Sequence, residues 1–175
     1  ALQEGVIQPN ETVYDSGALT IGGWPIRNHD RKGNGVVDFA TVLQVSSNVG
    51  MVQAMRKMRP SNYWDWLSRL GLDAKPDTDL PGAVAGQLKT KEQFTTQPIE
   101  PATAAFGQGF SLTPLKLVQL HALIANGGRL VSPHITRGLR AGHALAPSGE
   151  RMGQPLLRPE VTRTVLNWME SVVEK

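Results

Sequence analysis

The sequence predicts a mainly α-helical fold with short strands and long connecting loops, and three observations support this. Apolar residues recur every three or four positions, the spacing of one helix face, in four segments: 39–58, 60–72, 113–126 and 159–173. Residues that favour helix ends stand at the boundaries of these segments. Gly, Pro, Asn and Asp are frequent in the stretches 5–37 and 73–101, which indicates loops with brief strands.

Length and composition suit one globular unit, residues 1–175. Hydrophobic residues make up 40% and charged residues 19%, with a formal net charge of +3. Lys and Arg are scattered, which argues against nucleic-acid binding. The absence of cysteine excludes thiol nucleophiles and disulfides. No run approaches the roughly 20 apolar residues of a membrane span. The chain lacks an initial Met and opens on "ALQEGVIQPN", which is typical of a helix end, so we expect a piece of a longer protein.

In the first 58 residues we expect two strands and two helices. The strands are Thr12–Tyr14 and Leu19–Ile21, and a turn follows at 31–35. The first helix, Phe39–Val45, has Asp38 as its N-cap, because an Asp side chain accepts a hydrogen bond from a free N–H of the first turn. Residues 46–48 interrupt the pattern. The second helix has its apolar face at Val49, Val52, Met55 and Met58.

A third helix is expected over "RPSNYWDWLSRLGL", with Ser61 as its N-cap. Gly71 supplies the left-handed residue that ends the helix, so that Leu72 can fold back. Its apolar stripe, interpreted as core, consists of Tyr63, Trp66, Leu67 and Leu70.

No metal or cofactor site is expected. Asp77 and Asp79 lie in a Pro-Gly turn without a third ligand, so turn chemistry explains them better. The histidines lack metal-ligand spacing, and His121 is expected to be a hydrogen-bonded core residue on a buried helix. These histidines are His29, His121, His134 and His143.

Two further helices are expected in the second half of the chain. One begins after Thr113 as N-cap, with Pro114 at its first position, and ends at the Gly pair 127–128. We expect it to be buried on most sides, with a first face at Leu115, Val118, Ala122 and Ala125 that is widened by Leu117, Leu120 and Leu123. Residues 129–135 are expected to be extended. The last helix is Pro159–Val173, with an inner face at Val161, Val165, Trp168, Met169 and Val172.

Two interpretations of "SSN", residues 46–48, compete. Short polar side chains disfavour helix interiors, so these residues can cap the second helix. A Ser-x-Asn corner can also direct a hydroxyl and a carboxamide into a cleft, where the hydroxyl passes a proton and the carboxamide holds an amide substrate. On local physics alone the cap is favoured.

Longer stretches change this balance. "ALQEGVIQP", "VLQVSSNVGMVQ", "FGQGFSLTPLKLVQLHALIANGG" and "VTRTVLNWMESVV" occur in this order along the chain. Together they resemble the transpeptidase domain of class B penicillin-binding proteins, the septal and elongation enzymes that cross-link peptidoglycan. The resemblance implies the helical subdomain of an α+β fold, without most of its central antiparallel sheet.

In that family three motifs build the active site: Ser-x-x-Lys, Ser-x-Asn and Lys-Thr/Ser-Gly. This chain has only the second, because no serine is followed by lysine at the third position and "KTK" at 89–91 ends in Lys. The resemblance implies that Ser-x-x-Lys lies just before Ala1 and Lys-Thr-Gly shortly after Lys175 in the longer protein.

The resemblance also implies roles for individual residues. Ser46 would hydrogen-bond the motif lysine and relay a proton, and Asn48 would hold that lysine and the amide of the substrate or antibiotic. Ser47 is expected to be a cap. Gln108 is expected beneath the cleft as a substrate-binding residue, although its flanking glycines equally suggest tight backbone packing.

The implied partners are peptidoglycan stem peptides, β-lactam antibiotics and membrane proteins of division or elongation. The parent would lie in the cell envelope, on the periplasmic or extracytoplasmic face of the membrane, anchored by an N-terminal transmembrane helix. By itself this chain is expected to be inactive and to self-associate through exposed apolar surface.

Three alternatives stay open. One is a β-lactamase or β-lactam sensor, which rapid antibiotic turnover would reveal. Another is a non-catalytic interaction module of the division or elongation machinery, whose parent would lack one of the other motifs. The third is a basic nucleic-acid module, which salt-dependent binding would reveal.

Overall fold

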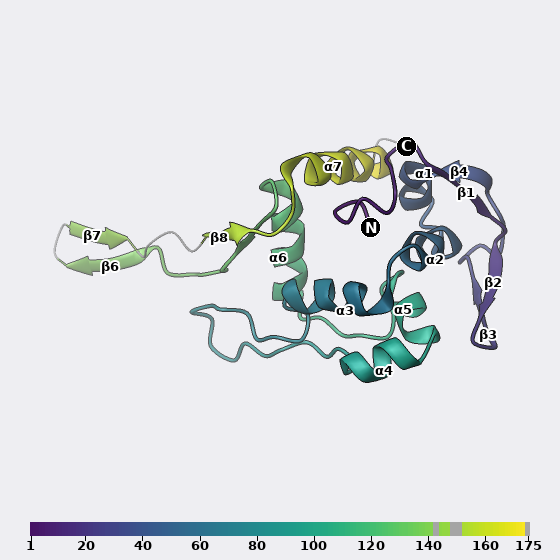
Figure 1. Cartoon of the computed structure of the whole chain (residues 1–175). Coiled ribbons are helices and arrows are strands. Elements are labelled where there is room, and N and C mark those ends of the chain that lie inside the picture. Colours follow the sequence, from purple (N-terminus) through teal and green to yellow (C-terminus); the bar gives the residue numbers. More distant parts are fainter. Residues whose placement is uncertain (142–143, 148–151, 174–175) are drawn as a thin grey trace.

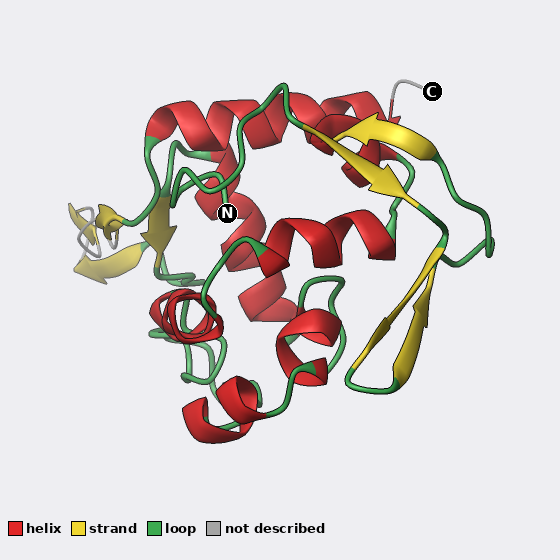
Figure 2. Ribbon diagram, turned by 45° about the vertical axis from the view of Figure 1, so that its right-hand side comes forward, coloured by secondary structure: helices red, strands yellow, loops and turns green. Residues whose placement is uncertain are grey.

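The computed structural model describes residues 1–141, 144–147 and 152–173. Helices dominate this part of the chain, and the strands form separate two-stranded ribbons at its margins (Figures 1 and 2). The helices are α1 (Phe39–Gln44), α2 (Asn48–Arg56), α3 (Pro60–Arg69), α4 (Lys91–Thr96), α5 (Ile99–Ala104), α6 (Pro114–Ala125) and α7 (Pro159–Val173).

All strand pairs of the described residues are antiparallel. They are β1 (Thr12–Asp15) with β4 (Gly35–Asp38), β2 (Ala18–Ile21) with β3 (Trp24–Arg27), β5 (Arg129–Val131) with β8 (Met152–Pro155), and β6 (Gly138–Ala141) with β7 (Ala144–Pro147). The β6–β7 hairpin projects away from the helices (Figure 1). The ribbons do not join into a larger sheet within the described residues.

The β2–β3 hairpin turns at Gly22 and Gly23, which both have positive φ, 55° and 84°. A two-residue turn of this kind matches the twist of the flanking strands and needs residues that tolerate left-handed backbone. Pro25 is accommodated because β3 has only one neighbour and its free edge needs no N–H donor. Sequence reasoning identified β1 and β2 but not their partners β3 and β4.

Helix α2 lies between two hydrophobic clusters and forms the centre of the N-terminal half. On one side Ala54 packs with Val13, Phe39 and Val42. On the other side Val52 and Met55 pack with Ile26 and Ala102. A third cluster joins α3, α4 and α5 through Leu67, Leu72, Phe94 and Ala104. The expected inner face of α2 is confirmed, and Met58 is also buried.

Helix α7, near the C-terminus, packs against the N-terminal part of the chain. It runs beside α1 (Figure 1), and Trp168 packs against the cluster that contains Phe39. Gln44 Nε2 donates to the Ser171 carbonyl at 2.8 Å, and Arg158 N donates to Gln3 Oε1 at 2.9 Å. No helix in the described part of the chain is long and apolar enough to cross a bilayer.

Several helix boundaries agree with the sequence analysis. Asp38 accepts from Thr41 N at 2.8 Å and caps α1, and Thr113 accepts from Lys116 N and caps α6. After α3, Gly71 N donates to the Ser68 carbonyl and Leu72 N to the Leu67 carbonyl, which is the predicted Schellman ending.

The expected cap at Ser61 is wrong. Helix α3 begins at Pro60 with Arg59 in the cap position and no side-chain cap. The fixed φ of proline suits the first helical position, so the helix starts one residue before the serine. The expected loop at 73–101 is wrong in part, because it contains the six-residue helices α4 and α5.

The expected burial of α6 on most sides is also wrong. Val118 and Leu117 are exposed, whereas Lys116 and Gln119 are buried. Lys116 Nζ donates to Gln119 Oε1 at 2.7 Å and lies at the C-terminus of α3, where helix carbonyls favour a cation. Burial lowers the pKa of Lys116, and the charge of Asp73 opposes this shift.

Other corrections concern single side chains. His121 is exposed, not a core residue, and its ring contacts the carbonyl of Leu117 at 2.9 Å. Val172, expected on the inner side of α7, is 43% exposed. His143 lies outside the described residues.

Asp77 and Asp79 bind a distant segment of the chain, which the sequence analysis did not predict. Asp79 accepts from the backbone N–H groups of Ile135 and Thr136 at 2.9 and 3.0 Å, and Asp77 accepts from Ser132 Oγ at 3.2 Å. The two carboxylates therefore fasten the loop after α3 to the segment that follows β5.

Candidate active site

Ser46 lies at the junction of α1 and α2 and has a left-handed backbone, φ 55°. Its N–H donates to the Leu43 carbonyl at 3.1 Å, and that of Ser47 donates to the Val42 carbonyl at 2.9 Å. These two bonds are a Schellman ending of α1, in which the left-handed position is usually glycine. The sharp ending leaves the Ser46 side chain exposed at a corner.

Ser47 is the N-cap of α2, as the sequence predicted for the middle residue of the tripeptide. Its Oγ accepts from Gly50 N at 2.9 Å, which satisfies one of the free donors of the first turn. A second free donor, Val49 N, reaches Asn28 Oδ1 at 3.1 Å. Ser47 is 1% exposed, so this start of α2 is held away from solvent.

Asp15, at the end of β1, is the buried charge beneath this corner. It accepts from Gly17 N at 2.8 Å, Asn28 Nδ2 at 2.9 Å, Asn34 Nδ2 at 2.6 Å and Ser47 Oγ at 2.8 Å. Burial disfavours the charged form, but these hydrogen bonds outweigh burial and lower the pKa of the Asp15 carboxyl. The carboxylate is therefore the stable form at neutral pH.

Asn48 begins α2 and faces the β2–β3 ribbon. Its Nδ2 donates to the Arg27 carbonyl at 2.8 Å. Together with Gln108 it lines a pocket of about 280 Å³ between β3, α2 and α5, whose other lining residues include Arg27 and Thr103. The structure thus brings Asn48 and Gln108 to one cavity, while Ser46 is not among the residues that line it.

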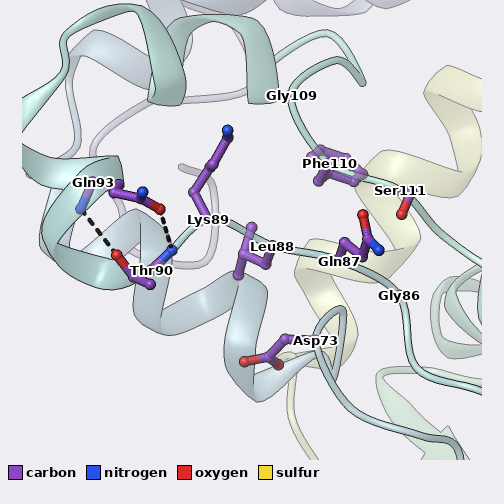
Figure 3. Close-up of a pocket in the computed structure, with 10 residues that line it drawn as sticks. All are labelled: Asp73, Gly86, Gln87, Leu88, Lys89, Thr90, Gln93, Gly109, Phe110 and Ser111. Atoms are coloured by element: carbon purple, nitrogen blue, oxygen red, sulfur yellow. Dashed lines mark hydrogen bonds between the residues drawn. The ribbon is translucent and has the colours of Figure 1, made fainter.

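Lys89 and Thr90 of the "KTK" tripeptide line a different cavity, the 810 Å³ pocket of Figure 3, between residues 86–90 and 109–111. Thr90 is the N-cap of α4, and it shares a reciprocal capping box with Gln93: Gln93 N donates to Thr90 Oγ1 at 3.2 Å, and Thr90 N donates to Gln93 Oε1 at 3.3 Å. Its hydroxyl serves a helix, which agrees with the interpretation that "KTK" is not the third motif.

Because Ser46 has positive φ, Ser46→Gly is expected to stabilise the protein by about 1 kcal/mol relative to Ser46→Ala. Ala keeps the Cβ that disfavours this backbone, and Gly removes it. Urea unfolding of both variants measures the difference. Equal unfolding free energies would contradict a strained corner.

The depressed pKa of Asp15 makes its contribution pH-dependent. Stability from a lowered carboxyl pKa is present above the unfolded value of about 3.9 and is lost as pH falls through the folded pKa. We therefore expect the difference in unfolding free energy between the wild type and Asp15→Asn to shrink as pH falls from about 4. Denaturant unfolding across the acid range checks this, and a constant difference would contradict it.

Sequence reasoning missed Asp15, Asn28 and Asn34. Each lies in the Gly-rich stretch before α1, where Asn and Asp are ordinarily explained by turns. Their sequence separations from Ser47 and from one another hide the cluster, since 32 residues separate Asp15 from Ser47. The usable signal was the frequency of Asn and Asp in residues 5–37, which includes all three.

Comparison with known proteins agrees with this architecture. The family model of the penicillin binding protein transpeptidase domain matches residues 1–175. The peptidoglycan D,D-transpeptidase FtsI homolog of Chlorokybus atmophyticus is 41% identical over 150 residues, covering 79% of this chain and 22% of the relative. The penicillin-binding protein PbpB of Mycolicibacterium smegmatis is 29% identical over 178 residues, covering 100% of this chain and 27% of the relative.

Solved structures give the same result. A peptidoglycan synthetase from Bifidobacterium adolescentis superposes with a TM-score of 0.90 at 25% identity, over 99% of this chain and 32% of the other. Penicillin-binding protein 3 of Mycobacterium tuberculosis, complexed with aztreonam, gives 0.89 at 25% identity, over 99% of this chain and 39% of the other. The chain spans about a quarter of the length of the curated relatives it matches. With its helices, its Ser-x-Asn corner and a match along its whole length, this chain belongs to the penicillin-binding protein transpeptidase family.

Proposed function

We propose that this chain is part of a peptidoglycan D,D-transpeptidase and supplies the Ser-x-Asn element of its active site through Ser46 and Asn48. The observation that carries the proposal is the α1–α2 corner, which exposes Ser46 and places Asn48 at a pocket, in a chain matched over residues 1–175 by the transpeptidase model. We take residues 1–175 as one structural unit, the helical subdomain of the α+β domain, with most of the central sheet supplied by other parts of the protein.

The proposed reaction is a two-step acyl transfer. The serine of a Ser-x-x-Lys motif, activated by its lysine, attacks the D-Ala–D-Ala carbonyl of a stem peptide and expels D-alanine. An amine of a neighbouring strand then attacks the acyl-enzyme and releases the serine. A β-lactam acylates the same serine, consistent with the aztreonam complex of the mycobacterial relative.

Within that reaction Ser46 hydrogen-bonds the lysine and passes a proton to the leaving amine. Asn48 uses its carboxamide to hold the lysine and the substrate amide, and its bond to the Arg27 carbonyl fixes its orientation. Gln108 lines the same pocket and contacts the bound peptide. The protein would work in the cell envelope, on the extracytoplasmic face of the membrane, with division or elongation proteins as partners.

The first test is to read the parent gene on both sides of residues 1–175 and to label the full-length protein with a fluorescent penicillin. Ser-x-x-Lys before Ala1, Lys-Thr/Ser-Gly after Lys175, stable covalent labelling and release of D-alanine from a stem peptide are expected. An intact reading frame that lacks either motif would make the protein a non-catalytic interaction module. Rapid turnover of the antibiotic would make it a β-lactamase.

A further inference from the structure

We propose that Asp15 is a positioning residue for the Ser-x-Asn corner and sets the places of both Ser46 and Asn48. This inference rests on the proposed function for its catalytic consequence. Asp15 touches neither side chain itself. It acts through two short hydrogen-bonded routes, one through Ser47 and one through Asn28.

The first route leads to Ser46. Asp15 Oδ2 accepts the hydroxyl hydrogen of Ser47 at 2.8 Å, and that hydroxyl in turn accepts from Gly50 N at 2.9 Å. Ser47 N also closes the end of α1 on the Val42 carbonyl. Ser47 is thereby held at both its side chain and its backbone. The residue before it, Ser46, cannot relax from its left-handed backbone without breaking one of these bonds.

The second route leads to Asn48. Asp15 accepts from Asn28 Nδ2, whose other hydrogen goes to the Lys32 carbonyl at 2.9 Å, so the Asn28 amide is fully fixed. Asn28 follows Arg27 directly, and the Arg27 carbonyl accepts the Asn48 side chain at 2.8 Å. Asn28 Oδ1 also accepts from Val49 N. The backbone that orients Asn48 is thus fastened from below by Asp15.

A carboxylate suits this place better than any other side chain. Four donors converge on Asp15, from Gly17, Asn28, Asn34 and Ser47, and a carboxylate offers about four lone-pair sites and no hydrogen. Asparagine has nearly the same shape but only one acceptor oxygen, and its NH₂ group would face donors. Because Asp15 is 1% exposed, water does not readily replace the lost acceptor.

The experiment compares Asp15→Asn, Ser47→Ala and the double variant in the full-length protein. Acylation by a fluorescent penicillin is expected to fall about 10- to 100-fold in Asp15→Asn. The double variant is expected to be acylated at most about twofold more slowly than the slower of the two single variants, because both changes break the same route. Amide exchange of Val49 and Gly50 is expected to rise in Asp15→Asn.

Phe94→Leu provides the matched control, because Phe94 is a fully buried side chain of a different cluster. It is expected to lower stability, keep wild-type acylation in the folded protein, leave exchange at Val49 unchanged and combine additively with Asp15→Asn. If Asp15→Asn misfolds, Asn34→Ala removes one partner of Asp15 and is expected to give a smaller change of the same kind.

The exchange measurement separates the inference from the proposed function. Unchanged amide exchange at Val49 and Gly50 in Asp15→Asn would overturn the positioning role. So would a double variant in which the losses of acylation rate from Asp15→Asn and Ser47→Ala multiply. If the wild type is not acylated at all but exchange at the corner rises in Asp15→Asn, the proposed function fails and the positioning of the corner by Asp15 stands.

Discussion

Ser46→Ala is expected to lower the rate constant for acylation about 10²–10⁴-fold in the full-length protein, the usual contribution of a positioned proton-transfer group. The change removes only the hydroxyl. Ala keeps the Cβ, and the Ser46 backbone takes part in the ending of α1 through its N–H. We therefore expect the unfolding free energy to stay within about 0.5 kcal/mol of the wild type. Stopped-flow labelling with a fluorescent β-lactam and urea unfolding measure the two quantities.

Two other serines provide the controls for this prediction. Ser47→Ala, in contrast, is expected to lower the unfolding free energy by about 1–2 kcal/mol, because Ser47 is a buried N-cap. Ser132→Ala, in the segment after β5, is expected to leave acylation unchanged, because its hydroxyl donates to Asp77 at 3.2 Å and helps to fasten the loop after α3. A wild-type acylation rate in Ser46→Ala would show that the corner acts only as a helix cap.

The helices that sequence predicted well carry strong local signals. Helix α7 matches its expected bounds, Pro159–Val173, because it begins with proline and keeps an apolar spacing over 15 residues. Helix α6 matches at Thr113 and Pro114 for the same local reason. The prediction of its burial was wrong, because the sequence does not show that Lys116 finds a partner at the C-terminus of α3 and Gln119 one on β5.

The elements that sequence missed are short and depend on tertiary contacts. Helices α4 and α5 have six residues each, too few for a periodic pattern, although the capping box of Thr90 and Gln93 marked the start of α4. Strands β3 and β4 have four residues each and become visible only through their partners.

The residues of the candidate site also divide into those with a motif or local signal in the sequence and those without one. Ser46 and Asn48 could be named because a known family motif contains them, and Ser47 because capping is local physics. Asp15 and Asn28 could not, since their role is defined by hydrogen bonds to residues 19 to 32 positions away. Gln108 was placed near the cleft by resemblance, and it shares a pocket with Asn48.

Gly50→Ala is expected to damage both stability and activity, because Gly50 of α2 packs tightly against Val42 of α1. A Cβ on Gly50 would lie 2.5 and 2.6 Å from the two methyl carbons of Val42. Val42 is 0% exposed and β-branched, so it has little freedom to rotate away. Overpacking typically costs about 1–3 kcal/mol, against about 1 kcal/mol gained from the better helix propensity of alanine. Because the new Cβ would clash with two methyl groups, we expect a net loss of about 1–2 kcal/mol of unfolding free energy.

The activity loss is expected to be larger than the stability loss suggests. Relief of the clash must move α1 away from α2, and the Ser46 corner is the connection between them. A displacement of about 1 Å at a catalytic group can cost roughly 10²-fold in rate. The double variant Gly50→Ala/Val42→Ala supplies the control, because removing the Val42 methyl groups makes room for the new Cβ. Its loss of unfolding free energy is expected to be smaller than the sum of the losses in the two single variants. It is also expected to recover part of the acylation rate. Strict additivity of the two substitutions, measured by denaturant unfolding, would show that this contact does not set the geometry of the corner.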